Sequence, residues 1–122
     1  DNWLLLVTAN GVDCVLLPTC PVDASFRTRA VALAAITCQW MAICSVAQRR
    51  DLFASELIGP DGSSLGAAEN DWLLTAELNR DAAELDAALT FRRPWRARAR
   101  EGSIYGHHRP IDDPRSRDRT IV

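Results

Sequence analysis

An apolar run opens the chain and a second one follows it closely. Residues 2–10, NWLLLVTAN, end at Gly11, a pattern that predicts the last turns of a helix with a glycine cap. Residues 13–18, DCVLLP, then predict a short buried strand that Pro18 closes. The chain is thus expected to begin with a helix followed by a strand.

A long uncharged stretch follows. Asp23 or Ser25 can cap a helix running to about Gln39, and residues 40–46, WMAICSV, predict the next strand. Residues 30–48 carry no charge, and that length could indicate a membrane span. Polar residues interrupt the stretch and no cationic cluster suited to a topology signal lies nearby, so a buried helix followed by a buried strand is the favoured interpretation.

The middle of the chain predicts strands joined by a turn. Residues 52–59, LFASELIG, alternate well enough for a strand. The sequence GPDGSS, residues 59–64, predicts a tight turn, because Pro60 presets φ and Gly62 tolerates a positive φ.

Beyond that turn the hydrophobic pattern predicts two strands and a helix, and after the helix no regular hydrophobic spacing remains. Residues 65–69 and 71–78 are further strand candidates, and residues 80–89 predict a helix with two leucines four positions apart. Residues 92–122 are expected to form an Arg-rich extended arm, frayed beyond Pro110. The order of elements predicts an α/β fold with helices packed on a mixed sheet.

Composition narrows the class of protein. The chain has 122 residues, 48% of them hydrophobic and 25% charged, which suits one globular domain or part of one. The net charge of −2 argues against a general nucleic-acid binder. Residues 1–91 are acidic and residues 92–122 are basic. All 14 cationic side chains are arginine, so no lysine of this chain can take part in catalysis.

The cysteines and the first residues of the chain indicate in which cellular compartment the protein resides. Four cysteines without a CxxC spacing predict neither a zinc site nor a disulfide framework, and reduced thiols in a cytoplasmic protein are expected. Cys14, Cys38 and Cys44 are interpreted as buried packing residues. The start, DNWLLLV, is not a signal peptide, and we interpret it as the beginning of a chain that starts within a longer domain.

Several strings, taken in order, resemble the carbon–nitrogen hydrolase (nitrilase) superfamily. Phe53, Ser55 and the Pro60-Asp61-Gly62 turn give the strongest match, and the likeness extends to about residue 110. The matching strings are GVDCVLLPT, RAVALAAITCQWMAICSV, FASELIGPDGSSLGAA, WLLTAELN and RRPWRARAREGSIYGHHRP.

The resemblance implies a partial α-β-β-α sandwich: residues 1–91 would be the C-terminal part of the domain and residues 92–122 its C-terminal arm. Members of the family hydrolyse amide, nitrile or N-carbamoyl groups with a Cys-Glu-Lys triad, which would lie upstream of this chain. The resemblance therefore implies no catalytic residue here, no metal and no cofactor. The loop at Thr19, Cys20 and Pro21 would line the substrate pocket.

The resemblance also implies partners. The intact enzyme would take a small-molecule amide, nitrile or carbamoyl substrate and would form a homo-oligomer, with no nucleic acid and no membrane involved. One departure is notable: Thr37 and Cys38 stand where the family usually carries Glu-Asn, which favours a divergent or inactive subfamily. The alternative is a non-catalytic interaction or oligomerisation module derived from the same fold.

Other reactive residues have structural explanations. Cys20 could line a pocket or simply fill a loop, and a nucleophile is the least favoured of its three roles. Adjacent His107 and His108 lack a third metal ligand at a useful spacing, so a solvated loop is expected. The Arg-rich tail better suits docking on an acidic surface than binding nucleic acid. Ser55 lies in no nucleophile-elbow motif and is interpreted as structural.

Overall fold

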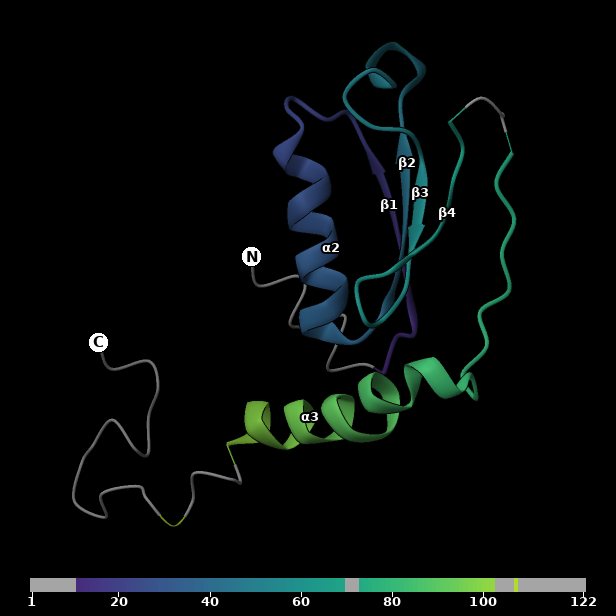
Figure 1. The fold of residues 1–122 in the computed structure, drawn as a ribbon. Coiled ribbons are helices and arrows are strands. Elements are labelled where there is room, and N and C mark those ends of the chain that lie inside the picture. The colour runs from purple at the N-terminus through teal and green to yellow at the C-terminus, as the bar shows by residue number, and fades with distance from the viewer. Residues whose placement is uncertain (1–10, 70–72, 103–106, 108–122) are drawn as a thin grey trace, which may run out of the picture.

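The computed structural model describes residues 11–69, 73–102 and 107, and Figure 1 shows how its helices and strands are arranged. The predicted helix over residues 2–10 lies outside the described residues. In chain order, the elements are β1 (Cys14–Thr19), α2 (Ser25–Thr37), β2 (Trp40–Ser45), η1 (Ala47–Arg49), β3 (Glu56–Ile58), β4 (Ser64–Ala67), η2 (Ala83–Leu85), η3 (Ala87–Arg92) and α3 (Arg93–Glu101).

The four strands form one mixed sheet in the order β1-β2-β3-β4. Strands β1 and β2 are parallel, with Cys14 opposite Trp40 and Thr19 opposite Ser45. Helix α2 connects them, as a parallel pair requires a crossover. Strands β2, β3 and β4 are successively antiparallel. The mixed α/β class expected from the sequence is confirmed.

Helix α2 has a capped start and a tightly closed end. The Asp23 carboxylate accepts a hydrogen bond from the Ser25 backbone N–H at 2.9 Å, which satisfies a free donor of the first turn. At the other end Cys38 adopts left-handed backbone angles with φ of 54°, and the Gln39 N–H bonds to the Ala34 carbonyl at 3.3 Å. This Schellman-type closure ends the helix at Thr37, two residues earlier than the sequence predicts.

The turn between β3 and β4 is the tight turn that the sequence predicts. The Gly59 N–H bonds to the Ser63 carbonyl at 2.7 Å and the Gly62 N–H to the Gly59 carbonyl at 2.9 Å. Gly62 has φ of 90°, as expected for the residue that follows a type I turn in a three-residue hairpin. The Asp61 carboxylate also accepts the Ser63 N–H at 2.9 Å. Local turn chemistry therefore fixes this hairpin.

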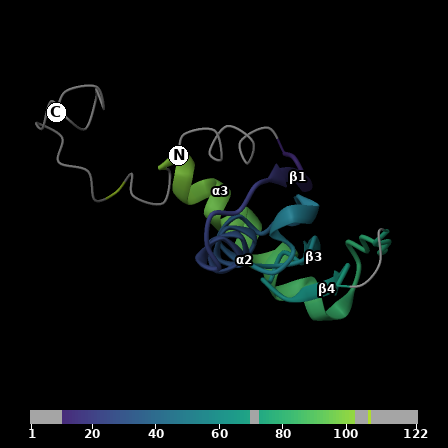
Figure 2. The same cartoon turned by 90° about the horizontal axis from the view of Figure 1, so that it is seen from above.

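Helix α2 covers one face of the sheet, as Figures 1 and 2 show, and the buried side chains between the helix and that face form the core. Each large aliphatic side chain buried there contributes roughly 2 kcal/mol of hydrophobic free energy. Leu17, Phe26, Val31 and Leu33 pack around its edge. The buried cluster consists of Ala30, Ala34, Met41, Ile43, Phe53 and Ile58.

Some predicted strands differ in the structure. The prediction of a strand over residues 71–78 is wrong for residues 73–78, which belong to no strand. Leu74 still lies beside β4, because its Cδ1 would be 3.0 Å from a Cβ added at Gly66. Pro18 does not close the first strand, since β1 continues to Thr19, and β3 is only three residues long. A ladder needs a partner at the right register, which apolar alternation alone cannot specify.

Helical structure extends further than the sequence predicts. It begins at Ala83 and continues through a π-helical stretch into α3, ending at Glu101. The expected extended arm is therefore wrong for residues 92–101, while most of its remainder lies outside the described residues. Pro94 is the second residue of α3 and follows the π-helical stretch directly. The alanines and arginines that follow are strong helix formers.

The uncharged stretch over residues 30–48 forms the end of α2, then β2 and the start of η1, so the predicted order of helix and strand is confirmed. The helix is only partly buried, because Ile36 on its outer side is 52% exposed. Within the described residues, no helix combines the length and apolar character needed to cross a membrane.

Candidate functional site

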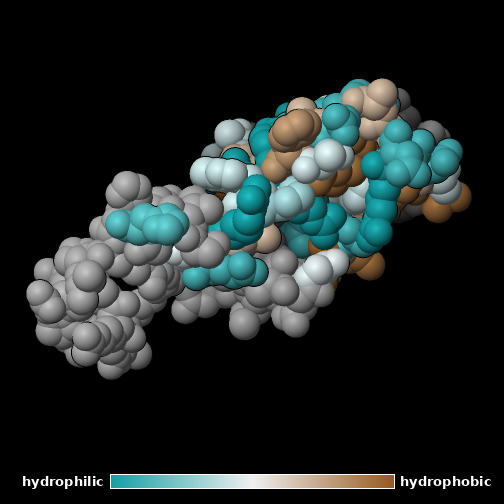
Figure 3. Space-filling model, turned by 90° about the horizontal axis from the view of Figure 1, so that it is seen from below, coloured by the Kyte–Doolittle hydropathy of each residue, from teal (hydrophilic) through white to brown (hydrophobic). Residues whose placement is uncertain are grey.

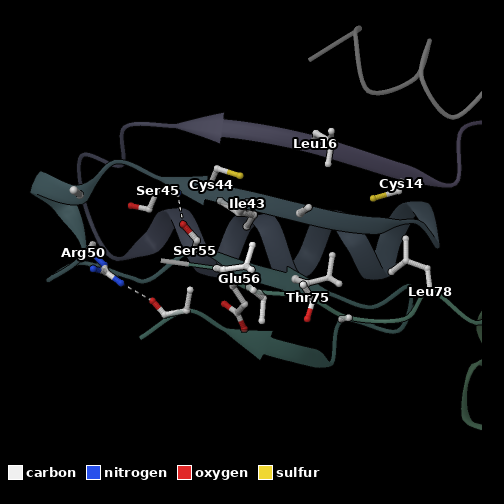
Figure 4. Close-up of a pocket in the computed structure, with 17 residues that line it drawn as sticks. Cys14, Leu16, Ile43, Cys44, Ser45, Arg50, Ser55, Glu56, Thr75 and Leu78 are labelled. Carbon is white, nitrogen blue, oxygen red and sulfur yellow. Dashed lines mark hydrogen bonds between the residues drawn. The ribbon is translucent and has the colours of Figure 1, made fainter. Parts of the chain in front are cut away.

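A hollow of about 650 Å³ lies on the sheet face opposite α2, where Figure 4 shows the side chains in front of the strands and the helix behind them. Strands β1, β2 and β3 form its floor, and the extended residues 73–78 form one wall. The lining residues are Cys14, Leu16, Ala42, Ile43, Cys44, Ser45, Ala47, Arg50, Ser55, Glu56, Leu57, Ala68, Leu73, Leu74, Thr75, Ala76 and Leu78.

Much of the hollow is apolar and open. Leu16 is 73% exposed and Leu73 is 75% exposed, although both are large aliphatic side chains. Cys44 is exposed on β2, while Leu57 on β3 is only 9% exposed. The described residues therefore cover this face well over β3 and poorly over β1.

One end of the hollow is polar. The Ser45 backbone N–H donates to the Ser55 hydroxyl oxygen at 3.0 Å, and the Ala68 N–H donates to the Ser55 carbonyl at 2.8 Å. Arg50 donates to the Ala68 carbonyl at 3.0 Å. The Ser45 hydroxyl is buried and has no hydrogen-bond partner among the described residues. Because this oxygen is shielded from solvent, the accessible polar groups at this end are backbone groups and the Arg50 side chain.

Glu56 lies at the hollow but its carboxylate is committed to the other face of the sheet. Its two oxygens accept hydrogen bonds from Arg27 of α2 at 2.7 and 2.6 Å. Burial raises the pKa of Glu56, but the hydrogen bonds from Arg27 and Ser64 and the charge of Arg27 outweigh burial and hold that pKa below its usual value. A carboxylate held in its ionised form is a poor general base at neutral pH.

The thiol of Cys14 is not activated. Burial raises its pKa above the ordinary value, and the backbone hydrogen bond with Ala42 opposes this only partly. The thiol therefore stays protonated at neutral pH, whereas a nucleophilic cysteine needs a lowered pKa or an adjacent base. The residues that line the hollow include no histidine and no lysine. They can bind and position a small molecule but supply no activated nucleophile.

The three residues predicted to line a substrate pocket lie at one edge of this region. Thr19 ends β1 directly opposite Ser45, and its carbonyl accepts the Val46 N–H at 3.3 Å. Cys20 is exposed in the loop that follows, and Pro21 is buried. None of the three is among the residues that line the hollow, although Thr19 is adjacent in register to Ser45, which does. Their role in a pocket remains a prediction.

The expected roles of the other reactive residues have mixed outcomes. Cys38 is fully buried, as predicted. Cys44 is exposed, so its interpretation as a buried packing residue is wrong, because it faces the open side of the sheet. The structural role of Ser55 is confirmed by its hydrogen bond to the Ser45 backbone. Among the described residues, no three metal-ligating side chains cluster.

Three ion pairs join residues far apart in the sequence, and no sequence pattern predicts which residues pair. Arg27 pairs with Glu56, and Arg80 and Arg93 both pair with Asp13. One signal was available for the first: an acidic residue within the apolar strand candidate at residues 52–59 is rarely buried without a partner. Comparisons with protein-family models, with curated proteins and with solved structures find no match to this chain.

Proposed function

We propose that this chain is the C-terminal part of a hydrolase domain that cleaves non-peptide carbon–nitrogen bonds in an amide, nitrile or N-carbamoyl substrate. Its catalytic Cys-Glu-Lys triad would come from residues upstream of Asp1. The observation that carries the proposal is the asymmetry of the sheet. One face is packed against α2, and the other presents Leu16 and Cys44 to solvent.

An open apolar sheet face favours a second layer in the intact domain. Sheets commonly bury one face against helices and the other against a further element, and large exposed apolar patches mark contact surfaces. Residues 73–78 add to this argument, because they run beside the sheet in no strand. Both features suit an α-β-β-α sandwich in which another part of the domain supplies the second sheet.

The chemistry of the hollow agrees with a supporting role. The apolar floor could hold a small uncharged substrate, while the chain contains no lysine to stabilise an oxyanion. Thr19 and Ser45 end the two parallel strands β1 and β2. Ligands in open α/β sheets bind outside such carboxyl ends. Thr19, Cys20 and Pro21 are accordingly proposed to border the substrate.

The test compares this chain with the longer protein encoded by its upstream reading frame. Both are assayed on simple amides and N-carbamoyl amino acids. We expect the longer protein to release ammonia and the 122-residue chain to be inactive. Replacing an upstream cysteine shortly before Asp1 should abolish activity, while Cys20→Ala in the longer protein should change KM more than kcat. Turnover by the short chain that Cys20→Ala abolishes would overturn the proposal.

The second candidate is a non-enzymatic interaction or oligomerisation module, which the same open face favours. Light scattering after size-exclusion chromatography separates the two. A module should self-associate as the 122-residue chain, and Leu16→Glu should prevent this, with Thr28→Glu on the exposed side of α2 as the control. A genuine start codon immediately before the Asp1 codon, together with specific dimers, would favour the module over the enzyme.

A further inference from the structure

Two arginines converge on one aspartate at the amino end of β1, away from the polar end of the hollow described above. The Arg93 guanidinium of α3 donates to one oxygen of Asp13 at 2.7 Å, and Arg80 pairs with the other oxygen. These residues lie 67 and 80 positions apart from Asp13 in the sequence, so only the fold brings them together. Figure 3 views the molecule from below, where hydrophilic side chains make up much of the surface.

The two arginines are held very differently. Arg93 is 25% exposed and also donates to the Val12 carbonyl at 3.1 Å and to the Gly11 carbonyl at 3.5 Å. Arg80 is 65% exposed, and Asp13 is its one partner among the described residues. Arg93 is therefore fixed by the fold, while most N–H donors of Arg80 remain open to solvent.

The cluster has an excess of positive charge beside a small hollow. Two guanidinium groups face a single carboxylate, and the described lining of this hollow holds no other titratable side chain. The hollow measures about 350 Å³ and is lined by Gly11, Asp13, Arg80, Leu89 and Arg93. Guanidinium groups match the geometry of phosphate and carboxylate oxygens through paired N–H donors.

We propose that this cluster is a binding site for an oxyanion, the phosphate or carboxylate group of a small molecule. Arg93, already anchored by Asp13 and two backbone carbonyls, supplies a fixed positive charge. Arg80 supplies the free donors and closes on the anion, and Leu89 contacts the neutral part of the ligand. Asp13 orients both guanidinium groups and balances one of their charges. The site is independent of the proposed hydrolase function.

Inorganic phosphate and acetate are the probes, each titrated at constant ionic strength against chloride while the melting temperature of the 122-residue chain is recorded. A ligand that binds only the folded state raises the melting temperature, by several degrees for a small domain at about ten times its Kd. Phosphate and acetate arms distinguish the two kinds of oxyanion. We expect Arg80→Gln to abolish the anion-induced rise in melting temperature. Arg80→Lys should keep part of that rise, because lysine retains the positive charge but lacks the paired N–H donors of a guanidinium group.

The control is Arg49→Gln, an exposed arginine of η1, which should leave the shift unchanged. Because Arg80 is mostly exposed, Arg80→Gln is expected to fold, and circular dichroism checks this. If that variant fails to fold, Leu89→Glu replaces it: the negative charge that it introduces beside the two arginines should weaken phosphate binding at least tenfold. No anion effect beyond that of chloride, or an effect that persists in Arg80→Gln, would overturn the proposal.

Discussion

The Glu56 carboxylate and the Arg27 guanidinium form a bidentate ion pair that joins strand β3 of the sheet to helix α2. The Nε–Oε2 distance is 2.7 Å and the NH2–Oε1 distance is 2.6 Å. The Glu56 side chain is only 4% exposed, whereas that of Arg27 is 49% exposed. The buried Glu56 carboxylate therefore depends on Arg27 for its stability, because a carboxylate removed from water needs a positive partner and hydrogen-bond donors.

Arg27→Met should lower the free energy of unfolding by about 2 kcal/mol, because it leaves the buried Glu56 carboxylate without a positive partner. The loss is not larger because water at the exposed position of Arg27 can partly solvate that carboxylate. Urea unfolding measures this. Arg29→Met is a matched control on the same helix, because its pair with Asp23 is exposed and 3.8 Å long. An equal effect of the two substitutions would contradict the special role of Glu56.

Glu56 should also make stability depend on pH. Its folded-state pKa lies below the ordinary value of 4.5, so the unfolded chain binds its proton first as the pH falls. The contribution of Glu56 is therefore complete above about pH 4.5 and is lost as the pH drops through the folded-state pKa. Urea unfolding at several pH values should show a steeper acid loss in the wild type than in Glu56→Gln. Parallel curves would refute this assignment.

The turn at Gly62 should tolerate few substitutions. Its φ is 90°, and an added Cβ would lie 3.3 Å from Ala35 Cβ and 3.4 Å from Val31 Cγ1 of α2. Gly62→Val should lower the free energy of unfolding by about 2 kcal/mol or more through backbone strain and crowding. Gly62→Asn should cost less, because asparagine tolerates positive φ. Thermal unfolding compares the two, and an unchanged melting temperature for Gly62→Val would count against the turn geometry.

Cys38 combines a left-handed backbone with complete burial. Its φ is 54°, and its thiol contacts the Ala35 carbonyl with a sulfur–oxygen distance of 3.6 Å. Cys38→Gly relieves a backbone cost of about 1 kcal/mol but loses buried contacts of similar size, so stability should change by less than about 1 kcal/mol. Cys38→Val should be clearly more destabilising, because β-branched residues resist this conformation. Chemical denaturation ranks the variants, and equal losses would argue against the cap.

The thiols should differ in reactivity toward an aromatic disulfide reagent. Cys20 and Cys44 are exposed and should react quickly in the folded chain. Cys38 is buried, and burial raises the pKa of Cys14, so both should react slowly until the chain unfolds. Cys44→Ser should remove one fast equivalent. Slow labelling of Cys44 in the longer protein, beside fast labelling in this chain, would indicate that another part of that protein covers the sheet face.

Short-range chemistry already determined several elements. Asp23 and Ser25 predicted the start of α2, and the sequence GPDGSS predicted the hairpin that places Gly62 at positive φ. These features depend on residues within a few positions of one another, so the sequence alone specifies them. The same local rules underestimated α3, because the lack of an apolar period hid a run of arginines and alanines with high helix propensity.

The tertiary structure decided which segments and charges meet. Residues 73–78 alternate like a strand but have no ladder partner, since pairing depends on a neighbour that sequence alternation does not name. Glu56 meets Arg27 across 29 positions, and Asp13 meets Arg93 across 80. The open face that carries Leu16 and Cys44 likewise follows from which side of the sheet α2 covers. The sequence determined those elements whose causes are local, such as the start of α2 and the β3–β4 turn. Only the fold determined the contacts, because burial and charge pairing join residues far apart in the chain.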